Sequence, residues 1–252
     1  LALGIAANEV NSVVGRALAS NVAVGAVSAL NYANQLNQLV IGVIGLSVAT
    51  SIFPSLAKLF GDGRADAGSG LLGDALRYVV FLVVPAACFA AAFSTEIVEL
   101  VYGRGGFDDQ AVKMTSGALF FYALGMLWMA IREILARAFY ALKDARTPVN
   151  NAIAGVVLNI GLSLVLAPRF GVSGLALATS ISAAVTSFLL LFAIRRRLGR
   201  DVASAFGRDF LSLTVIGIVS VCLVKSIESK LLPVSMPGSI LLQSVALFAL
   251  VF

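Results

Sequence analysis

Histidine is absent from this sequence of 252 residues, and charged residues make up only 12% of it. Without histidine there is no Ser-His-Asp or Cys-His nucleophile and no histidine-ligated metal. The charged share is about half the roughly 25% usual in soluble domains, which argues against a soluble enzyme or a nucleic-acid-binding protein. The two cysteines, Cys88 and Cys222, lie in apolar runs, so no disulfide framework is expected. The one adjacent pair of carboxylates, Asp108 and Asp109, cannot converge on one substrate bond. We expect no catalytic residue, no metal and no cofactor.

Long apolar runs take the place of charge. Hydrophobic residues make up 60% of the chain, and the mean hydropathy is +0.98. Apolar stretches lie near residues 1–20, 24–57, 76–95, 115–140, 148–167, 172–194, 209–227 and 238–252. All but the last can cross a bilayer as a helix, which needs roughly 20 residues, and none alternates as a barrel strand does. The sequence predicts an all-α polytopic membrane protein with about eight transmembrane helices, and we expect it to be a fragment of a longer chain.

The basic residues predict the orientation of these helices. Twelve Lys and Arg lie in the segments 58–77, 132–146 and 195–208, whereas five lie at 104–113, 169 and 225–230. Because loops rich in Lys and Arg stay in the cytoplasm, the first group is predicted to be cytoplasmic and residue 1 to start on that side. Residues 61–70 are predicted to be a flexible loop, residues 132–146 a basic membrane-surface anchor, and residues 101–108 a simple turn between helices.

The second apolar stretch carries several amides. Ser28, Asn31, Asn34, Gln35 and Gln38 fall within it, and positions 28, 31, 35 and 38 recur at helical spacing. An amide that faces lipid tails is costly, so this face must meet other helices or a hydrated cavity. Buried hydrogen bonding between helices is one interpretation. We favour a cavity at mid-membrane depth, suited to a ligand rich in sugar or peptide groups.

Other polar residues give weaker signals. Arg16, in the first stretch, either reaches the membrane surface or faces the cavity, where its guanidinium would suit a phosphate. Asn159, Ser163 and Thr179 supply oxygens for a candidate cation site, although no carboxylate accompanies them. Packing of small residues between helices is the preferred interpretation of the Ser and Thr in residues 172–194.

Four separated segments carry a resemblance to a known family. They are residues 24–39, residues 41–56, residues 102–108 and the run from Arg137 to Val149. In that order they resemble the MurJ (MviN) family of lipid II flippases, in the multidrug/oligosaccharidyl-lipid/polysaccharide exporter superfamily. The likeness covers nearly the whole chain and aligns it with the second half of such a protein. Many members carry Arg where this chain has Gln35, and an acidic residue where it has Gly15.

The resemblance implies an organisation and a function. Residues 1–194 would form the second six-helix lobe of a two-lobe exporter, 195–208 a basic cytoplasmic loop and 209–252 two additional helices. The cargo implied is lipid II, an undecaprenyl-diphosphate carrying a disaccharide-pentapeptide, moved across the bacterial inner membrane for cell-wall synthesis and cell shape. The N-terminal half of the same protein would complete the cavity. The cavity residues expected are Arg16, Ser28, Asn31, Asn34, Gln35 and Gln38. An exporter of another lipid-linked oligosaccharide or a drug, and a non-transporting membrane scaffold, are the competing hypotheses.

Overall fold

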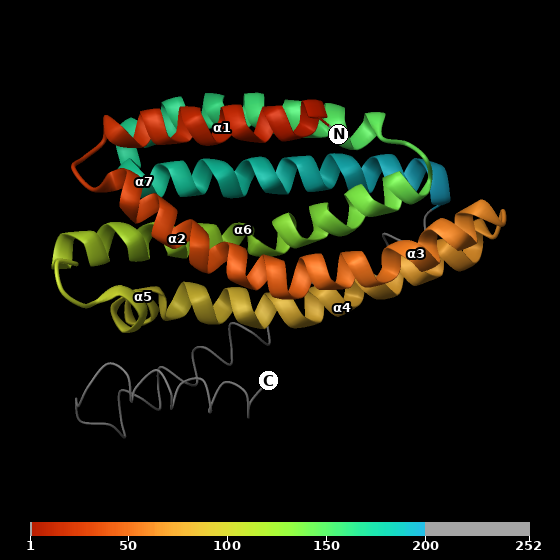
Figure 1. The fold of residues 1–252 in the computed structure, drawn as a ribbon, viewed down its shortest axis with the longest axis horizontal. Helices are drawn as coiled ribbons and strands as arrows, with labels where there is room; N and C mark the ends of the chain where they lie inside the picture. Colours follow the sequence, from red (N-terminus) through yellow and green to blue (C-terminus); the bar gives the residue numbers. More distant parts are fainter. Residues whose placement is uncertain (1, 200–252) are drawn as a thin grey trace, which may run out of the picture.

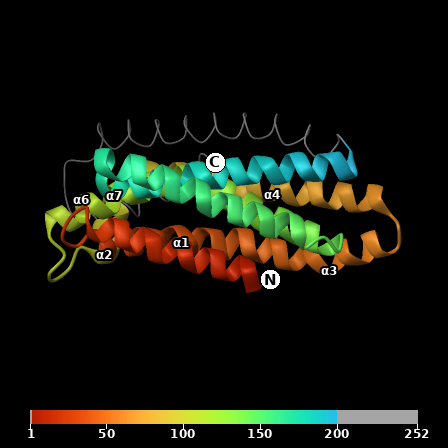
Figure 2. The same ribbon diagram turned by 90° about the horizontal axis from the view of Figure 1, so that it is seen from above.

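The computed structural model describes residues 2–199, and within that range it contains helices and no strand. The helices are α1 (Ala2–Ser20), α2 (Ala26–Val40), the π-helix η1 (Ile41–Leu46), α3 (Ser47–Gly61), α4 (Ala65–Ala92), α5 (Ser94–Tyr102), α6 (Asp109–Ala141) and α7 (Arg146–Leu198). Figures 1 and 2 show the long helices running side by side along one axis. The predicted helices at 209–227 and 238–252, and most of the basic loop 195–208, lie outside the described residues.

The limits of these helices do not all coincide with breaks in the chain direction. The segments α2, η1 and α3 follow one another without a break, as a single apolar stretch from Ala26 to Gly61. In contrast, α7 is two helices, because Gly171 adopts φ 60° and ψ −136° within it. This backbone conformation is essentially restricted to glycine and reverses the chain direction (Figure 1). The predicted separation of 148–167 from 172–194 is therefore confirmed.

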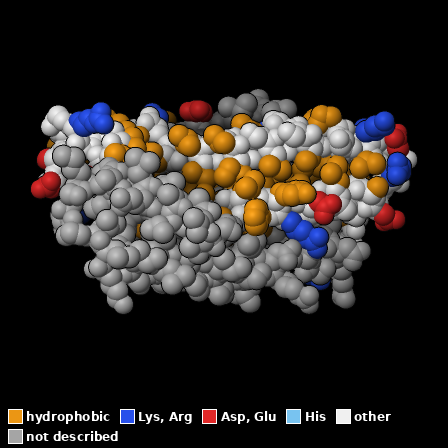
Figure 3. Space-filling view, turned by 90° about the horizontal axis from the view of Figure 1, so that it is seen from below, with side chains coloured by type: hydrophobic (Ala, Val, Ile, Leu, Met, Phe, Trp, Pro, Cys, Tyr) orange, Lys and Arg blue, Asp and Glu red, His pale blue; other side chains and the backbone are white. Residues whose placement is uncertain are grey.

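The surface is that of a membrane protein. Four helical segments of the described part are long and apolar enough to span a bilayer, the last of which comprises both halves of α7: Ala26–Gly61, Ala65–Ala92, Asp109–Ala141 and Arg146–Leu198. Large hydrophobic side chains such as Tyr78, Val157 and Phe188 are more than half exposed. Figure 3 shows hydrophobic side chains along the middle of one face, with most charged side chains near the two ends. Contiguous apolar surface of this kind requires lipid or a partner. The helix α1 is not among these four and carries Glu9 and Arg16.

The turns alternate between the two ends of the bundle. Residues 62–64, residues 142–145 and the last turn of α7 lie at one end, and residues 21–25, residues 103–108 and the turn between the two halves of α7 lie at the other (Figure 1). This is the alternation that the Lys and Arg pattern predicts.

Two segments differ from the sequence prediction. Residues 61–70 are mostly helical, because α4 already begins at Ala65. Gly68 packs so closely against the ring of Phe60 that a Cβ atom would clash, and this tertiary contact outweighs the low helix propensity of the glycines. The short helix α5 was not predicted. Nine residues are too few to show a clear hydrophobic period.

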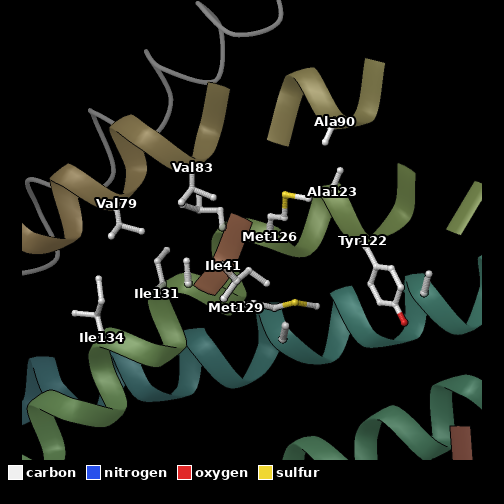
Figure 4. Close-up of a cluster of buried hydrophobic side chains, with 14 of the residues drawn as sticks. Ile41, Val79, Val83, Ala90, Tyr122, Ala123, Met126, Met129, Ile131 and Ile134 are labelled. Atoms are coloured by element: carbon white, nitrogen blue, oxygen red, sulfur yellow. The ribbon is translucent and has the colours of Figure 1, made fainter. Parts of the chain in front are cut away.

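The helix α6 is the centre of the bundle. It contacts α2, α3, α4, α5, α7 and η1. Ile131, Ile134 and Leu135 are completely buried. Figure 4 shows Val79 and Val83 of α4 facing Met126 and Ile131 of α6, with Ile41 of η1 beside them. This apolar core fixes α2 and α7 on the remaining sides of α6, where the polar residues gather.

A polar cavity between four helices

A cavity of about 410 Å³ lies between α1, α2, α6 and the two halves of α7. Most of the polar residues predicted to be functional line it. Its polar wall consists of Asn11, Ser12, Arg16, Asn31, Asn34, Gln38, Tyr122, Arg132, Glu133, Asn159, Ser163, Thr179 and Ser182. Amides, hydroxyls and charged groups from helices far apart in sequence are thus brought to one hydrated space.

The amides of α2 reach this cavity over one face only. At roughly 100° of rotation per residue, Asn31 and Gln38 lie about 20° apart on the helix, and Asn34 about 60° to one side. Asn31 and Gln38 are exposed, and Asn34 is half-buried. Their carboxamides offer both donors and acceptors to the space.

Two predicted residues lie outside the wall. Gln35 and Ser28 are turned about 40° and 60° to the other side of Asn31, and neither lines the cavity. Gln35 Oε1 accepts a hydrogen bond from the Tyr102 hydroxyl at 3.3 Å. The ring of Tyr102 lies 4.6 Å from that of Tyr32, between centroids. Gln35 therefore belongs to the contact between α2 and α5. The residues predicted from spacings of three and four span a wider face of α2 than the face that lines the cavity.

The cationic groups of the wall come from α1 and α6. Arg16 lines the cavity, as one of the two interpretations of its position requires. Arg132 and Glu133 line it as well, because α6 continues as a helix to Ala141. Neither residue was predicted to line the cavity, since the density of Lys and Arg at 132–146 indicated a membrane-surface anchor. A signal for them was present: Arg132, Met129 and Tyr122 share one helical face with spacings of three and seven.

The three candidate cation ligands also meet at this wall. Asn159, Ser163 and Thr179 all line the cavity. Asn159 Nδ2 donates to Asn11 Oδ1 at 2.8 Å, and the Thr179 hydroxyl donates to the Leu175 carbonyl at 3.0 Å. The buried Oδ1 of Asn159 accepts no hydrogen bond from any described residue. No carboxylate is part of this group, and the described residues contain no cluster of three His, Cys, Asp or Glu that could hold a metal.

One amide of α2, that of Asn37, is buried between helices, which is the alternative to lining a cavity. Asn37 is completely buried, and its Nδ2 lies 3.4 Å from the sulfur of Met129. Its Oδ1 has no hydrogen-bond partner among the described residues. Asn37 therefore lies in the seam between α2 and α6, not at the cavity.

Small residues and hydroxyls close the seam behind the cavity. Ser180 Oγ donates to the Phe121 carbonyl at 2.7 Å, and Ser187 Oγ to the Trp128 carbonyl at 2.6 Å. Ser182 Oγ donates to the Gly155 carbonyl at 2.7 Å. These bonds join the second half of α7 to α6 and to its own first half. Packing of Ser and Thr between helices, as predicted for residues 172–194, is confirmed.

The comparisons with known sequences agree on one family. The sequence model described as "Lipid II flippase MurJ" matches residues 1–245. The chain is 32% identical over 189 residues to the lipid II flippase MurJ of Burkholderia cenocepacia, covering 75% of this chain and 37% of that protein. It is 33% identical over 180 residues to the probable lipid II flippase MurJ of Rhizobium meliloti, covering 71% of this chain and 34% of that protein. The chain thus spans about a third of the length of these relatives.

Solved structures give the same result. A structure of "Lipid II flippase MurJ, inward closed conformation" superposes with a TM-score of 0.83 at 25% identity, over 98% of this chain and 50% of that one. A multidrug resistance MATE family transporter of the MOP superfamily, in an outward-facing conformation, superposes with a TM-score of 0.66 at 18% identity, over 90% of this chain and 51% of that one. The second likeness concerns the fold alone.

Proposed function

The chain belongs to the lipid II flippase MurJ family, and on this premise we propose that it is the second lobe of a flippase for undecaprenyl-diphosphate-linked peptidoglycan precursor. Alternating access exposes a site near the membrane midplane to each side in turn. In this proposal the cavity between α1, α2, α6 and α7 is this lobe's share of that site, and the N-terminal half of the same protein supplies the rest. The protein makes and breaks no covalent bond of its cargo.

The composition of the cavity wall carries the proposal. Two guanidinium groups, Arg16 and Arg132, line it with one carboxylate, Glu133. An excess of positive charge favours an anionic cargo, and guanidinium groups suit the paired oxygens of a diphosphate. The carboxamides of Asn31, Asn34 and Gln38 provide donors and acceptors for sugar hydroxyls and peptide groups. Arg132 thus supplies a cation that the neutral Gln35 does not.

Glu133 is the observation that favours a second candidate function. An exporter of cationic drugs needs a carboxylate in its cavity, and Glu133 lines this one. Glu9, the carboxylate of α1, is exposed and does not line the cavity. With two cations against one carboxylate, the anionic cargo is favoured.

Orientation and ion coupling complete the proposal. The Lys and Arg count supports a cytoplasmic location for residue 1 and for the turns 62–64 and 142–145 in a multi-pass protein of the bacterial inner membrane. The oxygens of Asn159, Ser163 and Thr179 are proposed as a weak site for a small cation, since the Asn159 Oδ1 is buried without a described partner. The role in the cell would be peptidoglycan synthesis and the maintenance of cell shape.

The test uses the full-length protein in cells depleted of other lipid II flippases. Arg132→Gln and Arg16→Gln should each cause lipid II to accumulate in the inner leaflet at normal protein levels. Arg104→Gln, an exposed residue of the loop between α5 and α6, is the control and should transport normally. Normal transport by the double variant Arg16→Gln/Arg132→Gln would contradict the role of this cavity.

A further inference from the structure

Basic side chains gather where α6 ends and where α7 both begins and ends. We name Lys143, Arg146, Arg195 and Arg196 the basic end; all four are exposed. The loop after α6 passes beside the last turn of α7 (Figure 1). Arg197 Nη2 lies 2.6 Å from Asp144 Oδ2, which places Lys143 and Arg146 next to Arg195 and Arg196.

Among the described residues, the carboxylate next to the basic end is that of Asp144, and both of its oxygens already have partners. Asp144 Oδ2 accepts from the Thr147 hydroxyl at 2.7 Å as well as pairing with Arg197. Asp144 Oδ1 accepts from the backbone N–H groups of Arg146 and Thr147, at 3.0 and 3.1 Å. Among residues 2–199, no carboxylate forms an ion pair with any of the four cations of the basic end.

One cation of the basic end, Arg196, contacts an exposed aromatic ring at the end of the apolar surface. The Arg196 guanidinium lies over the Phe192 ring, 4.3 Å from its centroid, and Phe192 is 55% exposed on the apolar surface. An arginine that extends along a lipid-facing aromatic ring toward the helix end holds its charge at the membrane interface. In a surrounding bilayer this would bring the basic end to the depth of the lipid phosphates.

Two cations of the basic end occupy positions that are unfavourable for the protein alone. Lys143 has φ 59°, the left-handed conformation that glycine normally provides after a helix. Its backbone closes α6, since Asp144 N–H donates to the Phe139 carbonyl at 2.9 Å. Arg146 is the first residue of α7, where the helix dipole disfavours a positive charge. Membrane orientation depends on how many Lys and Arg lie on each side of the membrane. It therefore does not require a cation at position 143 or at position 146.

We propose that the basic end binds the phosphate of anionic phospholipid headgroups, in the leaflet that borders the turn between α6 and α7. The occupant is argued from four cations that have no ion-pair partner among residues 2–199, from their place at the end of the apolar surface, and from the unfavourable positions of Lys143 and Arg146. Clusters of four or more Lys and Arg beside a transmembrane helix attract anionic lipid. The site lies at the helix ends and is separate from the polar cavity.

The test measures the preference of the full-length protein for spin-labelled phosphatidylglycerol over spin-labelled phosphatidylcholine, in phosphatidylcholine vesicles. Arg195→Gln/Arg196→Gln should lower this preference by roughly tenfold, since the variant removes two of the four cations that are proposed to act together on one headgroup phosphate. Lys58→Gln/Arg64→Gln removes two exposed cations, one in the last turn of α3 and one in the turn that follows it, at the same end of the bundle, and should leave the preference nearly unchanged. Transport of lipid II should persist in both variants.

Lys143→Gly separates binding from folding. Glycine relieves the left-handed strain, so this variant should unfold at a higher temperature while its preference for phosphatidylglycerol falls. An equal loss of preference in the control pair would show only diffuse attraction and would overturn the proposal. So would an unchanged preference in Arg195→Gln/Arg196→Gln. Binding of inorganic phosphate by the solubilised protein, without any lipid preference in vesicles, would assign the cluster to a soluble anion and also overturn it.

Discussion

Asn159 of α7 donates a hydrogen bond from its Nδ2 to Oδ1 of Asn11 in α1, over 2.8 Å, at the wall of the polar cavity. The two residues are 148 positions apart in sequence. Because α1 is not among the four helices apolar enough to span a bilayer by composition, its position depends on such polar contacts with α7 as well as on apolar packing.

The first prediction concerns this hydrogen bond. In a double-mutant cycle of Asn11→Ala and Asn159→Ala, the coupling in the free energy of unfolding should be about 0.6 kcal/mol and at most about 1.7 kcal/mol, the range for polar contacts between membrane helices. The measurement is denaturant unfolding in mixed micelles. Asn150, exposed on the same helix, gives the control variant Asn150→Ala, which should show no coupling to Asn11→Ala. Strictly additive effects of the first pair would contradict the assignment.

The second prediction compares two glycines of α7. A Cβ atom on Gly155 would lie 2.8 Å from Thr186 Cγ2, whereas one on Gly161 would meet nothing within 4 Å. Gly155→Ala should therefore lower the free energy of unfolding by about 1 to 3 kcal/mol through overpacking. Gly161→Ala should raise it by up to about 1 kcal/mol, because alanine favours the helix. Equal effects of both substitutions would mean that the seam between the two halves of α7 is looser than described.

The third prediction separates Gln38 from Gln35. Gln38→Leu removes a carboxamide from the cavity wall and should slow transport about fivefold, the value of one hydrogen bond of about 1 kcal/mol to cargo. Gln35→Leu removes only the exposed contact with Tyr102 and should change transport less than twofold, a change smaller than the worth of one hydrogen bond. Gln35→Arg should likewise leave the rate nearly unchanged. The readout is the rate of lipid II translocation at matched protein levels. A larger loss from Gln35→Leu than from Gln38→Leu would reverse our assignment of the two faces.

The fourth prediction concerns pH. The hydrogen bond from the Thr147 hydroxyl, further backbone hydrogen bonds and the Arg197 guanidinium hold the pKa of Asp144 below its ordinary value. A carboxyl with a lowered pKa in the folded state stabilises the fold above its unfolded pKa, near 3.9, and this contribution is lost as the pH falls through the folded pKa. Asp144→Asn should therefore lower the unfolding temperature at pH 7 and flatten its decline below about pH 4. An unchanged acid limb of the curve would contradict this role.

Much of the fold could be predicted because the membrane imposes it. Long apolar runs allow only helices, and the lengths of the runs located α4, α6 and both halves of α7. The features that were missed depend on individual contacts. The early start of α4 depends on the contact of Gly68 with Phe60, and the first turn of α7 is held locally by Asp144 Oδ1, which accepts hydrogen bonds from the backbone N–H groups of Arg146 and Thr147. Neither contact leaves a periodic trace in the sequence.

The cavity was predictable only in part. A face of amides indicated the inward side of α2 correctly, yet helical spacing alone could not distinguish Gln38 from Gln35, which lie about 60° apart. Arg132 was missed because a cation near a helix end is usually an interface anchor. Only the position of α6 at the centre of the bundle turns that residue toward α1 and α7.

The π-helix between α2 and α3 has a consequence for how this lobe can vary. A π-turn holds more residues than an α-turn, so Ile41–Leu46 offsets the rotational phase of α3 from that of α2. The face of α2 that lines the polar cavity and the face of α3 that packs on α4 therefore differ in rotational phase. Deletion of one residue from Ile41–Leu46 would change this phase difference and turn one of the two faces away from its contacts.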